Sequence, residues 1–169
     1  MRTTIEMGQL HIFQIAIILV IPYTDALQCR DGWTGFEGSC YYLSHGVATW
    51  AEAGAVCKML GSNLAMIETA AELTFLKSEL RHIHQHDADK MQYWIDGADL
   101  EVENVWRWTQ TEQIVSFTEW APGEPNAGEN DNCMNLWGKS GFRYADNDCE
   151  EHYHYVCQIR DPEGGELVG

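Results

Sequence analysis

The spacing of apolar residues predicts two helices in the first half of the chain. Apolar side chains recur at steps of three and four residues, which places them on one face of a helix. They are Trp50, Ala53, Val56, Cys57 and Leu60 in the first stretch and Leu73, Leu76, Leu80 and Ile83 in the second. Each stretch opens with Thr-x-x-Glu, a capping box in which hydroxyl and carboxylate satisfy free backbone amides. Gly61 supplies a left-handed stop after the first. We therefore expect helices at 49–60 and 69–82.

Short runs rich in aromatic and β-branched residues predict strands in the rest of the chain. They lie at residues 40–43, 93–96, 105–108, 134–137, 144–145 and 155–159. Helices early and strands mostly late indicate an α+β fold. Residues 109–132 form a long irregular stretch, and such a stretch inside a compact domain is usually functional or disordered. Its polar residues are of types that bind ligands, which favours a functional loop.

The N-terminal segment has the features of a secretory signal peptide. Arg2 precedes an apolar run at 12–21, and small residues follow up to Ala26. The run has about ten residues, whereas a helix needs roughly 20 to cross a bilayer. We expect a signal peptide at 1–26, one domain at 27–160 and a flexible tail at 161–169. An uncleaved signal anchor is the alternative, and no membrane span is expected after it.

The chain is strongly acidic. It has 26 Asp and Glu against 10 Lys and Arg, a formal net charge of −16. Such a field repels nucleic acid and anionic membranes, so neither is expected as a partner. It attracts divalent cations and the cationic faces of a mineral. Acidity that only keeps an exported protein soluble explains the same charge.

All six cysteines follow the expected signal peptide. An even count in an exported chain predicts a disulfide framework. No two cysteines have the Cys-x-x-Cys spacing of many zinc sites. Six cysteines allow 15 pairings, and the sequence alone does not choose among them.

Carboxylates and carboxamides cluster near two of the cysteines. They are Glu124, Asn126, Glu129, Asn130, Asp131, Asn132, Asp146, Asn147 and Asp148. Calcium takes roughly six to eight oxygen ligands of these types at about 2.3–2.6 Å. Zinc prefers thiolate or imidazole, and neither interrupts the cluster. The cluster therefore predicts a Ca2+ site.

The same residues resemble a known family. Glu124-Pro125-Asn126, an acid two residues before Cys133 and an aspartate three residues before Cys149 resemble the calcium and sugar site of C-type lectin domains. Trp94-Ile95-Asp96-Gly97-Ala98 resembles the family's Trp-Ile-Gly core strand with an aspartate interposed, and residues 105–108 resemble the strand after it. Small secreted invertebrate lectins, perlucin-like proteins included, are the most similar group. The resemblance implies a C-type lectin-like fold with two helices, antiparallel sheets and a long calcium-binding loop region.

The resemblance also implies the disulfides and the ligands. The pairs would be Cys29–Cys40, Cys57–Cys157 and Cys133–Cys149. Calcium would be held by Glu124, Asn126, Asp131 and Asp146. The first three would also contact sugar, with a cis bond before Pro125 turning two side chains toward the ion. The Glu-Pro-Asn order implies the mannose-type subset, and Asp99 and Glu103 match the ligands of a weak second calcium.

Three departures from the family pattern affect this site. Asp131 stands where a longer glutamate is more frequent, Tyr144 replaces a tryptophan, and Ala145 replaces an asparagine. The lost asparagine removes one calcium oxygen and one hydrogen-bond donor to sugar. A calcium-stabilised loop without sugar binding, or a lectin-like scaffold that binds protein, therefore stays open as an alternative.

Two other chemistries compete with the calcium site. His82, His84 and His86 alternate and precede Asp87 and Asp89, a pattern able to chelate zinc or copper. We favour a solvated connection with titrating imidazoles. Paired carboxylates such as Glu119 and Glu124 would suit a glycosidase. The acids cluster with amides, however, and no Gly-x-Ser-x-Gly or His-Glu-x-x-His sequence is present, so no enzyme is expected.

These features predict a secreted, extracellular, calcium-dependent lectin that takes part in innate recognition. Its partners would be glycans of the mannose, fucose, glucose or N-acetylglucosamine type. Shallow single sites bind weakly, which favours a homo-oligomer with avidity. The alternative is an acidic matrix protein with a lectin-like fold that binds calcium carbonate mineral or protein.

Overall fold

The computed structural model describes residues 28–126 and 130–160. The signal peptide and tail expected at 1–26 and 161–169 lie outside these residues, as do Ala127, Gly128 and Glu129. Within them, no helix has the length and apolar character needed to cross a membrane.

Two helices form where the capping boxes predict them. Helix α1 spans Trp50–Met59 and helix α2 spans Ala70–Ile83. The hydroxyls of Thr49 and Thr69 accept hydrogen bonds from the backbone amides three residues later, at 3.3 and 3.1 Å. Gly61 adopts φ +66°, as expected for a left-handed stop.

The buried faces of both helices are shorter than predicted. Ala53 and Cys57 of α1 and Leu73, Leu76 and Leu80 of α2 are buried. Leu60 and Ile83 were expected inward, yet they are 37% and 51% exposed. Each lies at the C-terminal end of its helix, past the last turn that packs on the sheet, so its position in the repeat does not bring it to the core.

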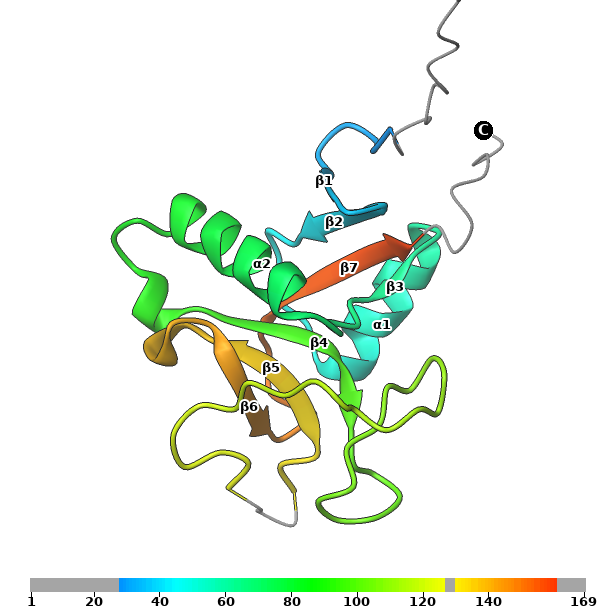
Figure 1. The fold of residues 1–169 in the computed structure, drawn as a ribbon, viewed down its shortest axis with the longest axis vertical. Helices are drawn as coiled ribbons and strands as arrows, with labels where there is room; N and C mark the ends of the chain where they lie inside the picture. Colours follow the sequence, from blue (N-terminus) through cyan, green and yellow to red (C-terminus); the bar gives the residue numbers. More distant parts are fainter. Residues whose placement is uncertain (1–27, 127–129, 161–169) are drawn as a thin grey trace, which may run out of the picture.

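The strands form one sheet in the order β1-β2-β7-β4-β5-β6, with β3 paired to β7. Their bounds are β1 Thr34–Phe36, β2 Ser39–Leu43, β3 Asn63–Leu64, β4 Gln92–Ala98, β5 Cys133–Trp137, β6 Arg143–Asn147 and β7 His154–Arg160. Short 3-10 helices, η1 Ala88–Lys90 and η2 Gly138–Ser140, join some of them. Figure 1 shows the long loops at the opposite end of the domain from β1.

The sheet is mixed, because one of its pairings is parallel. Strand β7 runs antiparallel to β2 but parallel to β4, with Tyr93 opposite His154 and Trp94 opposite Tyr155. The resemblance implied antiparallel sheets, and every strand pairing other than β4 with β7 is antiparallel. The last strand returns to the middle of the sheet, where antiparallel pairing with β2 fixes its direction and makes it parallel to β4.

The strand expected at 105–108 does not form. Arg107 makes only isolated bridges, to Ala98 and Ile114. Trp106 and Trp108 are 7% and 1% exposed and pack into the core. The apolar alternation of this segment therefore reflects burial of two indoles beneath the loops, without a continuous strand ladder.

Alternate side chains of the central strands pack into two hydrophobic cores, one on each face of the sheet. The α2 side contains Ile95, Met134 and Leu136, and the α1 side contains Trp94 and Cys133. Gly97 is required at the end of β4, because a Cβ there would lie 2.1 Å from the sulfur of Met134. The strand therefore packs closely on β5 just before the long loops begin.

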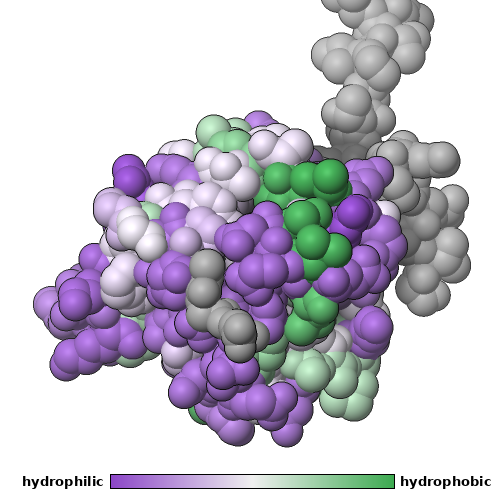
Figure 2. Space-filling view, turned by 90° about the horizontal axis from the view of Figure 1, so that it is seen from below, coloured by the Kyte–Doolittle hydropathy of each residue, from purple (hydrophilic) through white to green (hydrophobic). Residues whose placement is uncertain are grey.

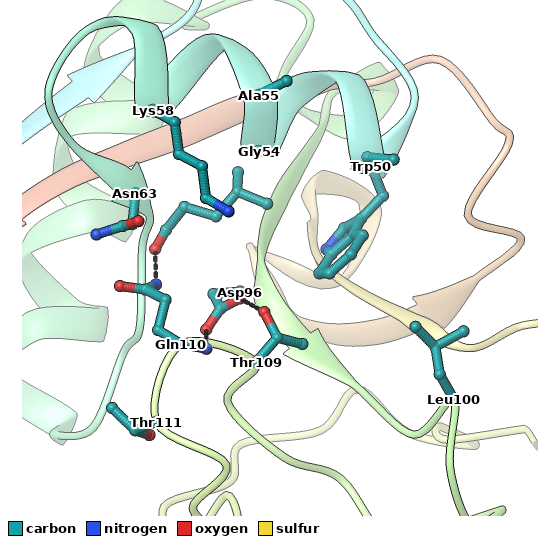
Figure 3. A pocket seen from close by; sticks show the side chains of 12 residues that line it. Trp50, Gly54, Ala55, Lys58, Asn63, Asp96, Leu100, Thr109, Gln110 and Thr111 are labelled. Atoms are coloured by element: carbon teal, nitrogen blue, oxygen red, sulfur yellow. Dashed lines mark hydrogen bonds between the residues drawn. The ribbon is translucent and has the colours of Figure 1, made fainter.

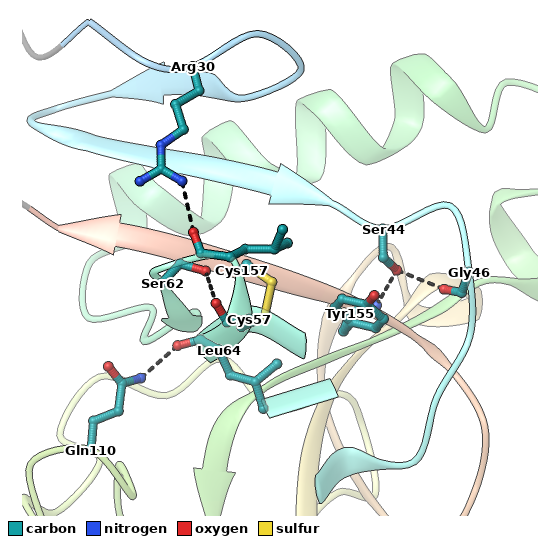
Figure 4. Close-up of a disulfide and its surroundings, with 10 residues drawn as sticks. Arg30, Ser44, Gly46, Cys57, Ser62, Leu64, Gln110, Tyr155 and Cys157 are labelled. Carbon is teal, nitrogen blue, oxygen red and sulfur yellow. Dashed lines mark hydrogen bonds between the residues drawn. A yellow bond between two sulfur atoms is a disulfide. The ribbon is translucent and has the colours of Figure 1, made fainter. Parts of the chain in front are cut away.

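All three implied disulfides are present. The pairs are Cys29–Cys40, Cys57–Cys157 and Cys133–Cys149. Figure 4 shows the second, which ties α1 to β7. The third joins the start of β5 to the segment after β6, and so brackets the loops that carry the acidic cluster.

Candidate functional site

The Glu124-Pro125-Asn126 segment lies in the long loop before β5. The bond between Glu124 and Pro125 is cis, as the family resemblance implied. The amide of Glu124 donates to the carbonyl of Ala121 at 2.9 Å, and Ala121 in turn donates to Tyr144 of β6 at 2.8 Å. The segment is thereby attached to the edge strand of the sheet.

Asp146, at the end of β6, joins this loop to the sheet. Its two carboxylate oxygens accept the backbone amide of Asn126 at 3.1 and 3.2 Å. Asp146 is only 3% exposed. Two segments twenty residues apart thus meet at one carboxylate, and the side chain of Asn126 stays at the surface.

Three carboxyl groups crowd together at this point. Burial, the adjoining Asp146 carboxyl and the charge of Asp131 raise the pKa of Glu124 to about 7. Burial and the charges of Asp146 and Asp148 also raise the pKa of Asp131. Like charges at close range disfavour ionisation. The metal-free site is therefore under electrostatic repulsion that a bound cation would relieve.

Glu124 has an oxygen available for such a cation. Its Oε2 is buried and has no hydrogen-bond partner among the described residues. A buried acceptor without a partner is costly, and a metal ion would satisfy it. The candidate metal ligands at this site are all oxygen atoms, the type that calcium prefers. The residues fit calcium, and they fit no soft metal.

The predicted ligands lie near one another without forming a compact cluster of acidic side chains. In residues 28–126 and 130–160, no group of three or more His, Cys, Asp or Glu side chains is arranged to hold a metal. Contacts and charges nevertheless bring Glu124, Asn126, Asp131 and Asp146 into one neighbourhood.

The pair expected at a second calcium site is only loosely associated. Asp99 is buried and accepts the amide of Asn104 at 2.8 Å, while its Oδ1 has no partner among the described residues. Burial raises the pKa of Asp99, with a contribution from Asp146. Glu103 is exposed and contacts the side chain of Asn104 at 3.4 Å. Of the two residues, Asp99 is the one that interacts electrostatically with the carboxylate cluster, through Asp146.

Two residues near the site are not among the four predicted calcium ligands. Asp148 lies close enough to Asp131 to raise its pKa. Asn135 is fully buried in β5, opposite Ala145 of β6, and neither polar atom of its side chain has a partner among the described residues. A lone carboxamide inside the apolar run Met134–Trp137 was the available signal for Asn135.

The competing chemistries find little support in the structure. His84 bridges the hydroxyl of Tyr93 at 2.7 Å and Asp87 at 3.2 Å, while His82 and His86 are exposed. Glu119, offered as half of a catalytic pair, instead contacts Lys77 at 2.8 Å and Arg143 at 3.5 Å. His84 and Glu119 therefore make contacts within the fold, and His82 and His86 lie at the surface.

The face that carries the loops is mostly polar. Figure 2 shows hydrophilic side chains over most of this face, crossed by a hydrophobic stripe. The exposed large apolar residues in the loops are Leu100, Val102 and Ile114. A polar, carboxylate-rich face suits a cation and a hydroxyl-rich ligand.

Sequence comparison finds relatives among small lectins. Perlucin-like protein of Mytilus galloprovincialis is 28% identical over 135 residues, covering 79% of this chain and 85% of the relative. Perlucin of Haliotis laevigata is 30% identical over 132 residues, covering 77% and 82%. The similarity extends over most of both chains.

Solved structures share the fold. The C-type lectin domain of murine dendritic cell inhibitory receptor 2, solved in complex with N-glycan, has a TM-score of 0.68 and 28% identity over 79% of this chain and 100% of that one. A calcium-independent type II antifreeze protein has a TM-score of 0.67 and 27% identity, covering 79% and 95%. One fold thus supports different ligands, and the side chains of the site must decide between them.

The sequence profile described as "Lectin C-type domain" matches residues 47–159. This range includes both helices, strands β3 to β6, all of β7 except Arg160, and the entire acidic cluster, while β1 and β2 lie before it. The chain belongs to the C-type lectin domain family.

Proposed function

We propose that this protein is a secreted, calcium-dependent lectin of mannose-type specificity, active in recognition of microbial glycans. Members of the family are generally binding proteins without enzymatic activity. The apolar N-terminus and the three disulfides support an oxidising, extracellular location. The observation that carries the proposal is the cluster of mutually repelling carboxylates, in which Glu124 has a buried oxygen with no partner among the residues that the structure describes.

The proposed calcium ligands differ in charge and in hydrogen-bonding capacity. Glu124, Asp131 and Asp146 supply anionic oxygens to Ca2+, and the Asn126 side chain supplies a neutral one. When bound, calcium offers open coordination positions to two vicinal sugar hydroxyls. Ionised Glu124 and Asp131 accept hydrogen bonds from these hydroxyls, whereas the Asn126 amide donates one. Asp99 would take a weaker second ion together with Glu103.

Retention on mannose resin tests this function. The refolded chain should bind in calcium and elute with a chelator. Asp146→Asn should flow through, because it loses a ligand charge and weakens the acceptor for the Asn126 amide. Asp89→Asn makes the same change at an exposed position outside the site and should be retained. Flow-through of a correctly disulfide-bonded wild type would contradict the proposal.

Ala145→Asn should strengthen sugar binding. It restores an oxygen and a hydrogen-bond donor within β6, and a hydrogen bond between neutral groups contributes about 0.5–1.5 kcal/mol, which is up to about one decade in affinity. Ala145→Leu adds similar bulk without polar atoms and serves as the control at this buried position. Titration calorimetry with methyl mannoside measures both. An asparagine variant that folds and binds no better than wild type would show that position 145 is not part of the site.

Mineral binding is the second candidate, favoured by the net charge of −16. An acidic lectin-like protein of the extracellular matrix would adsorb to calcium carbonate through many carboxylates. Free mannose would not reverse that adsorption, whereas it should displace the protein from mannose resin. Homo-oligomers would increase binding in either role by avidity.

A further inference from the structure

A pocket lies away from the acidic cluster, between α1 and the loop at 109–111. It has a volume of about 880 Å³, within the range of small-molecule sites. Figure 3 shows its walls: Trp50 and Lys58 from α1, Asn63 from β3, and Asp96 with Thr109 and Gln110 opposite the helix. Nothing proposed above uses these side chains.

One wall presents a fixed aromatic surface. The indole Nε1 of Trp50 donates to the carbonyl of Ile95 at 2.9 Å, which holds the ring in place. The ring is half-buried and lines the pocket. Its neighbours on α1 are small: Ala51, Gly54 and Ala55 leave open space over the helix. A flat ring with an apolar face can therefore pack against Trp50.

The opposite wall is built on the aspartate that interrupts the Trp-Ile-Gly pattern. Asp96 is 2% exposed, and it accepts hydrogen bonds from the Thr109 hydroxyl and from the backbone N–H of Gln110. Gln110 reaches across to donate its side-chain nitrogen to the carbonyl of Leu64 at 2.7 Å. Asp96 thus fixes the loop that closes the pocket, and the Gln110 side-chain oxygen stays available as an acceptor.

Two more polar groups are available at the edge. The Lys58 ammonium and the Asn63 carboxamide line the pocket and make no hydrogen bond to any residue that the structure describes. Lys58 supplies donors only, and Asn63 supplies a donor and an acceptor. Hydrogen-bond donors and acceptors therefore surround a fixed aromatic face. The positive charge of Lys58 is opposite in sign to the charge of Asp96, which lines the same pocket.

We infer that this pocket is a second carbohydrate site, which binds a neutral saccharide unit on Trp50 without a metal ion. A sugar ring has an apolar C–H face and an edge of hydroxyls, which matches the aromatic wall and the polar edge. The site does not depend on calcium or on the acidic cluster. Leu100, which follows Asp99 in the chain, also lines this pocket.

The test is a titration of isotope-labelled protein with cellobiose in excess chelator, followed by NMR. The expected result is a saturable shift of the Trp50 indole N–H and of the Asn63 and Gln110 side-chain amides. Ala55→Tyr places a large side chain in the pocket from an exposed helix position and should abolish the shifts. Met59→Tyr adds the same side chain to the same helix outside the pocket lining, at a position 79% exposed, and should keep them.

Several results would overturn the inference. They are the absence of saturable shifts, equal shifts in the Ala55→Tyr protein, or shifts confined to the loops at Glu124 and Asp131. Binding of glucuronic acid without binding of cellobiose would contradict a neutral ligand. Because chelator is present throughout, failure of calcium-dependent binding at Glu124 would not alter this outcome, and the two proposals are tested separately.

Discussion

Replacing Cys57 and Cys157 together by alanine should lower the free energy of unfolding by about 4–5 kcal/mol. This bridge closes a loop with a sequence separation of 100 residues, and the chain-entropy model assigns the largest stabilisation to the longest loops. Both cysteines are completely buried between α1 and β7. Urea unfolding of the wild type and the double variant measures the difference.

The Cys29–Cys40 bridge is the matched control. Its sequence separation is 11, for which the same model gives about 3 kcal/mol. The double alanine variant at this bridge should therefore keep its fold and lose less stability. Equal losses at the two bridges would mean that loop length does not determine their contributions.

Replacing Glu124 by glutamine should abolish calcium binding and make the metal-free protein more stable. The carboxyl has a pKa of about 7 in the fold against an ordinary value of 4.5, so the folded state binds its proton more tightly than the unfolded chain does. Its contribution to stability is complete below pH 4.5 and is lost as the pH rises toward 7. At pH 7.5 the charged group is repelled by Asp146 and Asp131, and glutamine removes that repulsion.

Thermal unfolding with and without calcium measures both effects. Wild type should have the lower metal-free melting temperature and a large rise on adding calcium, because an ion that binds only the folded state stabilises it. The Glu124→Gln protein should melt higher without metal and respond little to calcium. Glu37→Gln removes the same charge from an exposed turn far from the cluster along the chain and should behave as wild type. A full calcium response in the Glu124→Gln protein would remove Glu124 from the ligand set.

Local signals in the sequence predicted the helices well. Each start depends on a threonine and a glutamate three residues apart, and both capping boxes form. Prediction failed where burial depends on the rest of the fold. Leu60 and Ile83 are exposed because the sheet does not extend as far as the ends of the helices. The helical repeat in the sequence does not specify how much of each helix the sheet covers.

The strands were harder to predict for the same reason. The parallel contact of β4 with β7 joins residues about 60 positions apart, and its direction follows from the order in which the chain fills the sheet. The alternating pattern around Trp106 and Trp108 is the same whether the segment pairs as a β-strand or forms a loop with two buried indoles. Only the structure distinguishes the two.

The candidate site was predictable where a motif specifies it. The Glu124-Pro125-Asn126 segment and Asp146 meet as the family resemblance implied. The pattern gave no sign that Asn135 lies opposite Ala145, because cross-strand neighbours depend on register. It also gave no role to Asp96, whose contacts with Thr109 and Gln110 appear only when the loop folds back.

Calcium titration in the presence and absence of mannose tests the central proposal most directly. If the sugar completes the coordination of an ion held by Glu124, Asn126, Asp131 and Asp146, each ligand must tighten the other by the same factor. Calorimetry should therefore show a lower calcium Kd in saturating mannose than without sugar, and no sugar binding in chelator at this site. A calcium Kd that mannose leaves unchanged would contradict a shared site.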